Sequence, residues 1–227
     1  MKNRNSTKVS ENKLLNEIKG YLEAIIIAVI ITTFLFTTVG VAGSSMSPSL
    51  EGGSTDNLFE ALISGDRLFL PKYSTWLKRI GVGEYERGDV IVFREPPGKP
   101  CHPGASGRRA FLVKRLIGLP GDHVVVNTDG SVFLNGVKLN QSFITGLEGG
   151  RVRPTNAVDL VVQSNHFFVM GDNRPNSCDS RAYGSIPFQS IAGKATAVVW
   201  PIFRQGKLNL KLVTSPTEFA LIPQNAD

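Results

Sequence analysis

One long apolar run near the N-terminus dominates the hydropathy pattern of this chain. The stretch from Ala24 to Ala42 carries no charged side chain and consists mostly of Ile, Val, Phe, Leu, Ala and Thr. As an α-helix, a stretch of this length measures roughly 28 Å, close to the hydrocarbon thickness of a bilayer. The pattern therefore predicts a transmembrane helix, whose bounds we place at residues 23–42.

The charges before this run set the expected orientation of the helix. Basic residues outnumber acidic ones there, with Lys2, Arg4, Lys8, Lys13 and Lys19 against Glu11 and Glu17. Because the more positive flank of a membrane helix stays in the cytoplasm, we expect residues 1–22 to be a cytoplasmic tail. Everything after Ala42 then lies outside, which predicts a single-pass, type II protein of the cell (inner) membrane. A cleaved secretory signal is the alternative, but its apolar core would be only about 7–15 residues long.

Short β-branched stretches recur through the outer part of the chain and predict a mostly β fold. They are separated by Gly, Pro and Asn, and cover Arg67–Leu70, Asp89–Phe93, Phe111–Leu119, Val124–Asn127, Val132–Asn135, His166–Met170 and Ala195–Trp200. About 180 residues follow the apolar run, enough for one sizeable core with a small subdomain. We expect this outer domain to span residues 43–215.

Two turn signals divide the predicted strands further. Thr128-Asp129-Gly130 and Asn135-Gly136 favour tight reversals, because their residues tolerate positive φ where strands turn back. We therefore expect a small β subdomain over about residues 123–165.

Other segments lack a strand pattern. The stretch from Pro96 to Arg109 has too many Pro and Gly residues for regular structure and is typical of a loop. Glu51–Ser64 and Ser74–Val82 look like insertions with weak helical character. Residues 216–227 are expected to form a frayed C-terminal tail.

Composition narrows the classes of function. The net charge of +6 does not indicate nucleic-acid binding, because half of it belongs to the N-terminal tail and no basic run interleaved with aromatics occurs elsewhere. Cys101, His102 and His166 lack the ligand spacing of a metal site, and we expect neither a metal nor another cofactor.

The two cysteines, Cys101 and Cys178, both lie on the expected outer side, where oxidation can occur. The sequence leaves two arrangements open. One is a disulfide between them, and the other is a small buried thiol at 178 with a loop thiol at 101.

Ser45 is the most informative residue, because it follows the apolar run by three positions and so stands at the expected bilayer surface. A serine nucleophile needs a base. The three histidines, His102, His123 and His166, stand in no recognisable catalytic setting, and no Gly-x-Ser-x-Gly elbow is present. The Ser-x-x-Lys spacing at Ser10–Lys13 falls in the cytoplasmic tail and is attributed to chance.

Lys114 is a candidate base, because strand alternation puts it on the same face as Leu112 and Leu116. An ammonium on an apolar face loses solvation, so its pKa falls. At a pKa of about 10.4 roughly 0.04% of a lysine is neutral at pH 7, whereas at a pKa of about 8 roughly 10% is neutral. The structural alternative is a lysine whose stem lies on the sheet while its ammonium reaches water.

Four segments, in order along the chain, resemble the motifs of the bacterial type I signal peptidases, the Ser-Lys leader peptidases of family S26. These are a nucleophile box, a central strand motif, a lysine box and a final box, at Gly43–Leu50, Arg87–Phe93, Val113–Asp122 and Gly171–Arg181. Together they cover about 40 residues of the 227. Four matches in the same order behind a membrane anchor are far more specific than any one of them.

The resemblance implies a role for each matching residue. Ser45 would be the nucleophile, Lys114 the general base, and Ser177 the hydroxyl that orients the lysine amine. Met46 would pack beneath the nucleophile and line the small substrate pocket. Ion pairs that support the site without taking part in the chemistry would come from four residues, Arg115, Asp172, Asp179 and Arg181.

Gly43 marks a departure from part of the family, in which a Ser at this position helps to stabilise the oxyanion. We expect the oxyanion here to be bound by the Ser45 backbone N–H and a second backbone donor near Gly43. A Gly43→Ser substitution should then change turnover little, and a gain of about tenfold or more would contradict this hypothesis.

The resemblance also implies the fold, the reaction and the partners. It implies a mostly β catalytic core with a small β-hairpin subdomain, behind a single N-terminal transmembrane helix. The implied activity is that of a membrane-anchored serine endopeptidase (signal peptidase I), which removes signal peptides at small-x-small sites such as Ala-x-Ala. The substrate would bind extended at a sheet edge. The expected partners are signal-peptide-bearing preproteins and the lipid bilayer, with the secretion translocon close by and no nucleic acid.

Other readings of the same residues are kept open. One is a Ser-Lys maturation peptidase dedicated to a single substrate, and another is a catalytically inactive, membrane-tethered β module. The joint presence of Ser45, Lys114 and Ser177 argues against the inactive module. The membrane anchor argues against a self-cleaving repressor.

Overall fold

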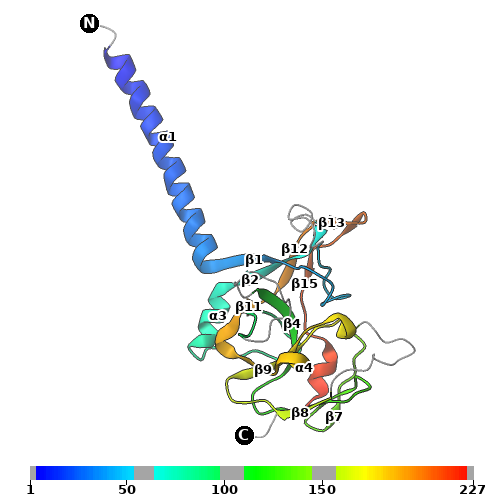
Figure 1. Cartoon of the computed structure of the whole chain (residues 1–227). Coiled ribbons are helices and arrows are strands. Elements are labelled where there is room, and N and C mark those ends of the chain that lie inside the picture. The colour runs from blue at the N-terminus through cyan, green and yellow to red at the C-terminus, as the bar shows by residue number, and fades with distance from the viewer. Residues whose placement is uncertain (1–3, 54–63, 98–109, 145–156, 224–227) are drawn as a thin grey trace.

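A long N-terminal helix projects from a β-rich body (Figure 1). The structure, a computed structural model, describes residues 4–53, 64–97, 110–144 and 157–223. Helix α1 (Arg4–Ile30) continues as a π-helical turn, η1 (Ile31–Leu35), and strand β1 (Phe36–Gly40) follows directly. Among the described residues, the one helical stretch that is long and apolar enough to cross a membrane is Leu15–Leu35.

The predicted helix over residues 23–42 is wrong at its C-terminal end. Residues Phe36–Gly40 are a strand that pairs with β2 (Arg67–Pro71) in antiparallel register, from Phe36 opposite Pro71 to Gly40 opposite Arg67. An uncharged run of Phe, Thr and Val suits a buried helix and a strand equally well, because β-branched residues also favour strands. Pairing with β2 favours the strand over the helix, and the local sequence pattern of residues 36–40 does not show that this pairing will occur.

Antiparallel sheets build the body. A five-stranded sheet has the order β10-β9-β4-β3-β11, and two four-stranded sheets have the orders β1-β2-β12-β15 and β7-β6-β5-β8, with β13 and β14 as a separate pair. The remaining strands are β3 (Val90–Arg94), β4 (Phe111–Gly118), β5 (His123–Val126), β6 (Val132–Leu134), β7 (Val137–Lys138), β8 (Val158–Val161), β9 (His166–Met170), β10 (Ile186–Pro187), β11 (Ile191–Lys194), β12 (Ala197–Trp200), β13 (Phe203–Arg204), β14 (Lys207–Leu208) and β15 (Lys211–Leu212). Every predicted stretch overlaps one of these strands or β2, which confirms the mostly β fold.

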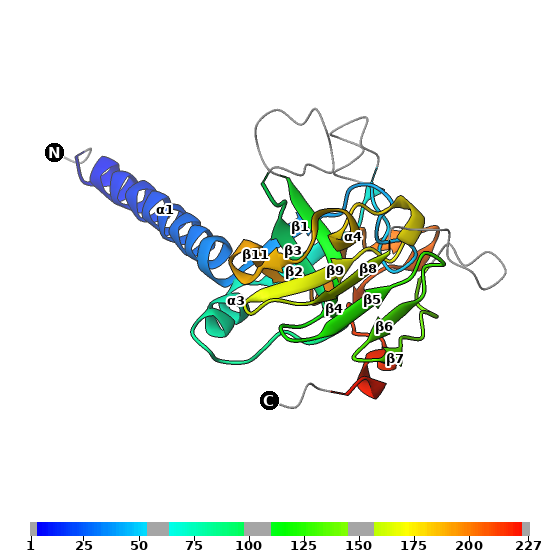
Figure 2. The ribbon, with the colours of Figure 1, turned by 60° about the horizontal axis from the view of Figure 1, so that its bottom comes forward.

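The sheets enclose three apolar clusters. One lies between the β1–β2–β12 sheet and strands β3 and β4, and it includes Met46 and Leu50 from the nucleophile segment. A second cluster joins β4 and β9 to the sheet of β5–β8, which lies beside them in Figure 2. The third packs the opposite side of β3, β4 and β9 against Tyr85 and Tyr183. The nucleophile segment is therefore anchored in the core itself.

Both predicted turns between β5 and β7 are present. Asn135 and Gly136 have φ values of 52° and 79°, and Gly130 has a φ of 80°. Two successive positive φ values are typical of the type I′ turn that joins hairpin strands, which explains the Asn-Gly pair.

The expectation of a frayed C-terminal tail is wrong for the residues that the structure describes. A short 3-10 helix, η4 (Thr217–Leu221), packs Phe219 into the cluster between β4 and β5, and Ile222 joins it. The Ile222 carbonyl oxygen also accepts a bond from Arg87 Nη1 at 3.4 Å. The tail is held because its two apolar side chains complete this cluster.

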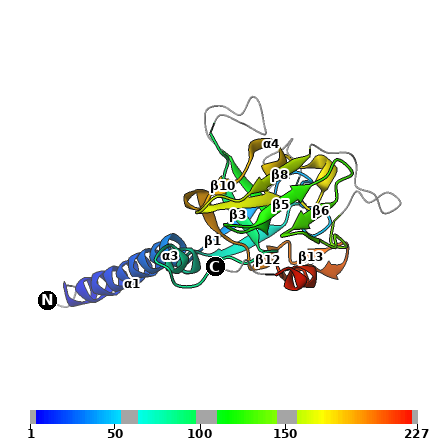
Figure 3. The same ribbon diagram turned by 90° about the horizontal axis from the view of Figure 1, so that it is seen from below.

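Helix α3 (Lys72–Arg79) lies at the C-terminal end of α1, as Figures 1 and 3 both show. It confirms the helical character that the sequence indicates for the second insertion. Residues 54–63 of the first insertion and residues 98–109 of the predicted loop lie outside the described part of the chain.

Candidate active site

Ser45 is held between two backbone anchors. Upstream, the Val41 N–H donates to the Asp66 carbonyl at 2.8 Å, and the Gly53 N–H donates to the Val41 carbonyl at 3.0 Å. Downstream, a single helical turn forms in which the Leu50 N–H donates to the Met46 carbonyl at 3.0 Å. Because Met46 and Leu50 are buried on one side of this turn, Ser45 is fixed just in front of the core.

Lys114 reaches Ser45 from strand β4. Its Nζ donates to Ser45 Oγ at 2.7 Å and to the Val113 carbonyl oxygen at 3.1 Å. Lys114 is only 4% exposed, so the ammonium does not reach bulk water. The sequence alternative of a lysine with a solvated ammonium therefore does not describe this residue.

Burial sets the proton affinity of this amine. Desolvation lowers the pKa of Lys114 from 10.5 to about 8, although the nearby carboxylates of Asp179 and Asp172 act in the opposite direction. Roughly a tenth of the lysine is then neutral at pH 7. A neutral amine within hydrogen-bond distance of a hydroxyl can remove its proton.

The final box closes over Ser45 from the other side. The Asn173 N–H donates to the Ser45 carbonyl at 3.1 Å, and Asn173 Nδ2 donates to the Ser44 carbonyl, also at 3.1 Å. A Cβ added at Gly171 would lie 2.5 Å from the Ser45 carbonyl oxygen and 2.2 Å from Ser177 Oγ. The close approach of this box to Ser45 therefore requires glycine at position 171.

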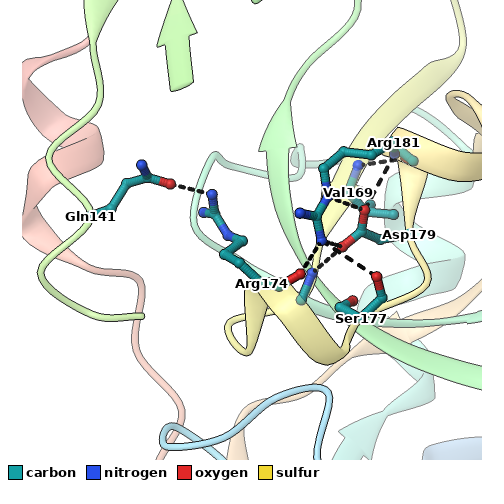
Figure 4. A network of polar contacts seen from close by, with 8 residues as sticks. Gln141, Val169, Arg174, Ser177, Asp179 and Arg181 are labelled. Atoms are coloured by element: carbon teal, nitrogen blue, oxygen red, sulfur yellow. Dashed lines mark hydrogen bonds and ion pairs between the residues drawn. The ribbon is translucent and has the colours of Figure 1, made fainter. Parts of the chain in front are cut away.

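Two bidentate ion pairs lie behind this contact. Arg115 Nε and Nη2 donate to the two Asp172 carboxylate oxygens at 2.8 and 2.6 Å. Arg181 likewise donates to both oxygens of Asp179 at 2.8 Å, and Asp179 Oδ2 accepts a bond from the Gly171 N–H at 3.0 Å. Figure 4 shows the Arg181 guanidinium against the Asp179 carboxylate, with the Ser177 and Arg174 carbonyl oxygens beside it. The four residues predicted as ion pairs thus pair with one another, and one pair holds Gly171.

Comparison with known proteins identifies the family of this chain. The model of the family described as "Signal peptidase, peptidase S26" matches residues 14–200, a range that includes Ser45, Lys114 and Ser177. This chain belongs to that S26 signal peptidase family. A probable signal peptidase I-2 from Synechocystis sp. is 32% identical over 198 residues, which cover 87% of this chain and 78% of the relative. A signal peptidase I from Bacillus licheniformis is 32% identical over 197 residues, 84% of this chain and 91% of the relative. A crystal structure of a signal peptidase I from Enterococcus faecalis aligns with 29% identity and a TM-score of 0.40, over 50% of this chain and 98% of that one.

Ser177 differs from its expected geometry in this S26 member. Its Oγ is buried and has no hydrogen-bond partner among the described residues, so it does not contact Lys114 Nζ directly. The hydroxyl instead packs beside Gly171. Its orienting role stays a prediction.

The backbone around Gly43 clarifies the expected oxyanion site. Gly43 has a φ of 71°, and its own N–H faces the Gly53 carbonyl at 3.4 Å. Within the described residues the Ser45 N–H makes no backbone hydrogen bond, as the expected oxyanion site requires. Space around Gly43 is open, but a serine there would have to adopt the left-handed conformation, which costs roughly 1 kcal/mol.

Asn173 is a site residue that the sequence reasoning missed, and the same reasoning missed the burial of Arg174 beside it. Arg174 is fully buried, with a hydrogen bond from Nη1 to Gln141 and no partner for Nε or Nη2 among the described residues. Burial lowers the pKa of this guanidinium to about 10. Both residues lie inside the final box, so membership of the box was the only available signal.

Cys178 is disulfide-bonded in the structure, which removes the alternative of a buried thiol at this position. The other cysteine of the chain, Cys101, lies outside the described residues. Among the histidines, His102 also lies outside them, His123 pairs with Asp159, and His166 Nδ1 contacts the Ser164 carbonyl. Neither described histidine makes a hydrogen bond to Ser45 or Lys114.

Proposed function

We propose that this S26 family member is a membrane-anchored serine endopeptidase that removes N-terminal signal peptides from exported preproteins. The observation that carries the proposal is the 2.7 Å contact between Lys114 Nζ and Ser45 Oγ, with burial lowering the pKa of the lysine to about 8. The contact supplies a nucleophile and a base, and the family gives the class of substrate.

The geometry supports a two-step acyl transfer. Neutral Lys114 takes the proton from Ser45 Oγ, which attacks the scissile carbonyl carbon and forms a tetrahedral intermediate whose oxyanion accepts a bond from the Ser45 N–H. The C–N bond then breaks, and the Lys114 ammonium gives its proton to the departing amine. Lys114 next removes a proton from a water molecule, which attacks the ester carbonyl. The ester C–O bond then breaks, the Lys114 ammonium returns that proton to Ser45 Oγ, and the acid is released.

The supporting residues keep the roles that the resemblance implies. Ser177 orients the Lys114 amine after its side chain turns, since catalytic hydrogen bonds often tighten only when substrate binds. Met46 supports the nucleophile from the core and borders the substrate pocket, and Gly43 lies beside the oxyanion. The Arg115–Asp172 and Asp179–Arg181 pairs hold the final box against Ser45.

A sheet edge beside Lys114 suits an extended substrate. Strand β4 pairs with β3 along Phe111–Arg115, but its pairing with β9 begins only at Arg115. Within the described residues, Phe111–Lys114 therefore has no strand on the β9 side. A preprotein segment added there would present alternate side chains to the same face, which fits cleavage at small-x-small sites.

The same proposal includes the arrangement of the chain in the cell. Helix α1 and the η1 turn together span the cell (inner) membrane within Leu15–Leu35, with the basic N-terminal end in the cytoplasm and the peptidase domain outside. The sheet of β5–β8 forms the small subdomain over about residues 123–165. Lipid and the neighbourhood of the secretion translocon complete the proposed surroundings.

The test is cleavage of a preprotein with an Ala-x-Ala site by the detergent-solubilised chain. Ser45→Ala and Lys114→Met should each lower kcat/KM by several orders of magnitude, of the size seen when a nucleophile or its base is removed. Ser44→Ala is the matched control, because among the described residues this neighbouring hydroxyl makes no hydrogen bond to Lys114, and the variant should retain activity. Full activity in Ser45→Ala would overturn the nucleophile assignment. No cleavage by a folded wild type would favour a dedicated maturation peptidase or an inactive module.

A further inference from the structure

Helix α3 exposes an apolar stripe. Tyr73, Trp76, Leu77 and Ile80 follow the i, i+3, i+4, i+7 spacing of one helix face, and their exposed fractions are 53%, 44%, 41% and 74%. Thr75, on the other side of the helix, is buried. In a soluble protein the apolar stripe of a surface helix normally faces the core, so α3 has the reverse arrangement.

The stripe lies against the outer end of the membrane-length helix. The rings of Trp76 and Phe34 are edge to face, with centroids 6.1 Å apart and an interplanar angle of 68°. Lys72 Nζ donates to the Thr33 carbonyl at 2.9 Å. Thr33 and Phe34 both belong to the Leu15–Leu35 stretch, so α3 sits where that stretch ends.

We propose that α3 lies in the outer leaflet of the bilayer that α1 crosses, as a second, interfacial contact between the peptidase body and the membrane. Thr33 and Phe34 lie at the end of the proposed membrane span. Lys72 and Trp76 contact them, so these two side chains of α3 must lie at the same depth in the bilayer. Trp and Tyr prefer the headgroup level, and Leu77 and Ile80 enter the acyl boundary as the apolar face of an interfacial helix does.

The contact restricts the orientation of the catalytic body. A body joined to a single helix can swing about that joint, whereas a second contact beside the joint removes most of this freedom. The inference rests on the proposed membrane anchoring, and its consequence for catalysis rests on the proposed signal peptidase activity. The α3 stripe would then hold Ser45 at a constant height over the membrane, where a membrane-resident signal peptide ends.

The two tryptophans of the chain, Trp76 and Trp200, allow a direct test. The full chain with Trp200→Phe, reconstituted in phosphatidylcholine vesicles, reports from Trp76 alone. Lipids brominated near the headgroup should quench its fluorescence by about half or more, and aqueous iodide should quench it weakly. Strong quenching by iodide together with no effect of brominated lipids would overturn the proposal. This readout does not depend on any peptidase activity.

A paired kinetic measurement tests the consequence. Trp76→Asp and Ile80→Asp should lower kcat/KM for a preprotein inserted in vesicles by about tenfold, because the loss of the second contact lowers the effective concentration of the site at the membrane. Cleavage of a short water-soluble peptide with the same site should stay within about twofold, which also shows that the variants fold. Equal losses on both substrates would contradict the membrane role. Cleavage of neither substrate by wild type would refute the proposed function while leaving the quenching result valid.

Discussion

The buried Lys114 destabilises the folded state at neutral pH. The fall of its pKa from 10.5 to about 8 corresponds to roughly 3 kcal/mol. This penalty is fully present below about pH 8, where the amine is charged in both the folded and the unfolded chain. It disappears as the pH rises above about 10.5, where the amine is neutral in both.

Lys114→Met should therefore unfold at higher denaturant concentration than wild type at pH 7. The expected gain is about 1–3 kcal/mol, because the lost hydrogen bonds to Ser45 and Val113 offset part of it, and it should vanish near pH 11. Denaturant unfolding of the solubilised chain at both pH values measures it. The exposed Lys138→Met is the control and should show no gain at either pH, and a Lys114→Met variant less stable than wild type at pH 7 would contradict the account.

In the proposed mechanism, the pKa of Lys114 also governs the reaction rate. Since only neutral Lys114 can act as a base, kcat/KM should rise about tenfold per pH unit up to about pH 8 and then level off. A pH profile with a soluble peptide substrate measures this. Ser44→Ala should give the same profile, and a rate that is flat between about pH 6 and pH 8 would exclude Lys114 as the titrating base.

A substitution at Gly171 measures how much activity depends on the close approach of the final box to Ser45. Gly171→Ala should lower kcat/KM by about a hundredfold, because its Cβ would displace the Ser45 carbonyl or the Ser177 side chain. Gly40→Ala is the matched control, since a Cβ at that position in β1 meets nothing within 4 Å. Comparable activities of the two variants would show that the contact is not critical.

At the scale of elements, the sequence predicted where strands occur better than it predicted which strands pair with one another. His166–Met170 was predicted with the bounds that the structure shows, because Gly and Asn punctuation delimit it. Phe36–Gly40 was assigned to a helix, because local pattern does not contain the pairing with β2. The same reason applies to the site: Ser45 and Lys114 stood out by residue type, setting and motif, whereas the bonds from Asn173 and the position of Ser177 Oγ depend on tertiary packing.

The link between β4 and β5 depends on a buried ion pair. Arg87 Nε and Nη2 donate to Asp122 at 2.7 and 2.6 Å, and the Leu119 N–H also donates to this carboxylate, at 2.8 Å. Asp122→Ala should lower the free energy of unfolding by about 3–5 kcal/mol, because it leaves a buried guanidinium without its partner. Asp159→Ala, which removes the exposed partner of His123, should change it by less than about 1 kcal/mol. Similar losses in both variants, measured by denaturant unfolding, would refute this ranking.

At the scale of the whole molecule, the boundary between anchor and body lies at Leu35. A chain that begins at Phe36 keeps β1 and its pairing with β2, so it should fold and cleave a soluble peptide while losing most activity on membrane-inserted preprotein. A chain that begins at Gly43, the start of the domain predicted from sequence, lacks β1 and leaves β2 as an open edge, which favours aggregation. Size-exclusion chromatography and peptide cleavage distinguish the two truncations, and equal behaviour would show that β1 is dispensable.

Strand β1 also has a mechanical consequence. It follows the η1 turn directly, and it pairs with β2 of the body. Because this pairing makes β1 rigid, the anchor and the nucleophile segment are joined by a rigid strand. A thinner bilayer makes a membrane helix tilt, and such a tilt would be transmitted along this strand to the catalytic face. The distance of the cleaved peptide bond from the lipid surface would then be set by the protein, and membrane thickness would help to determine which peptide bond is cut.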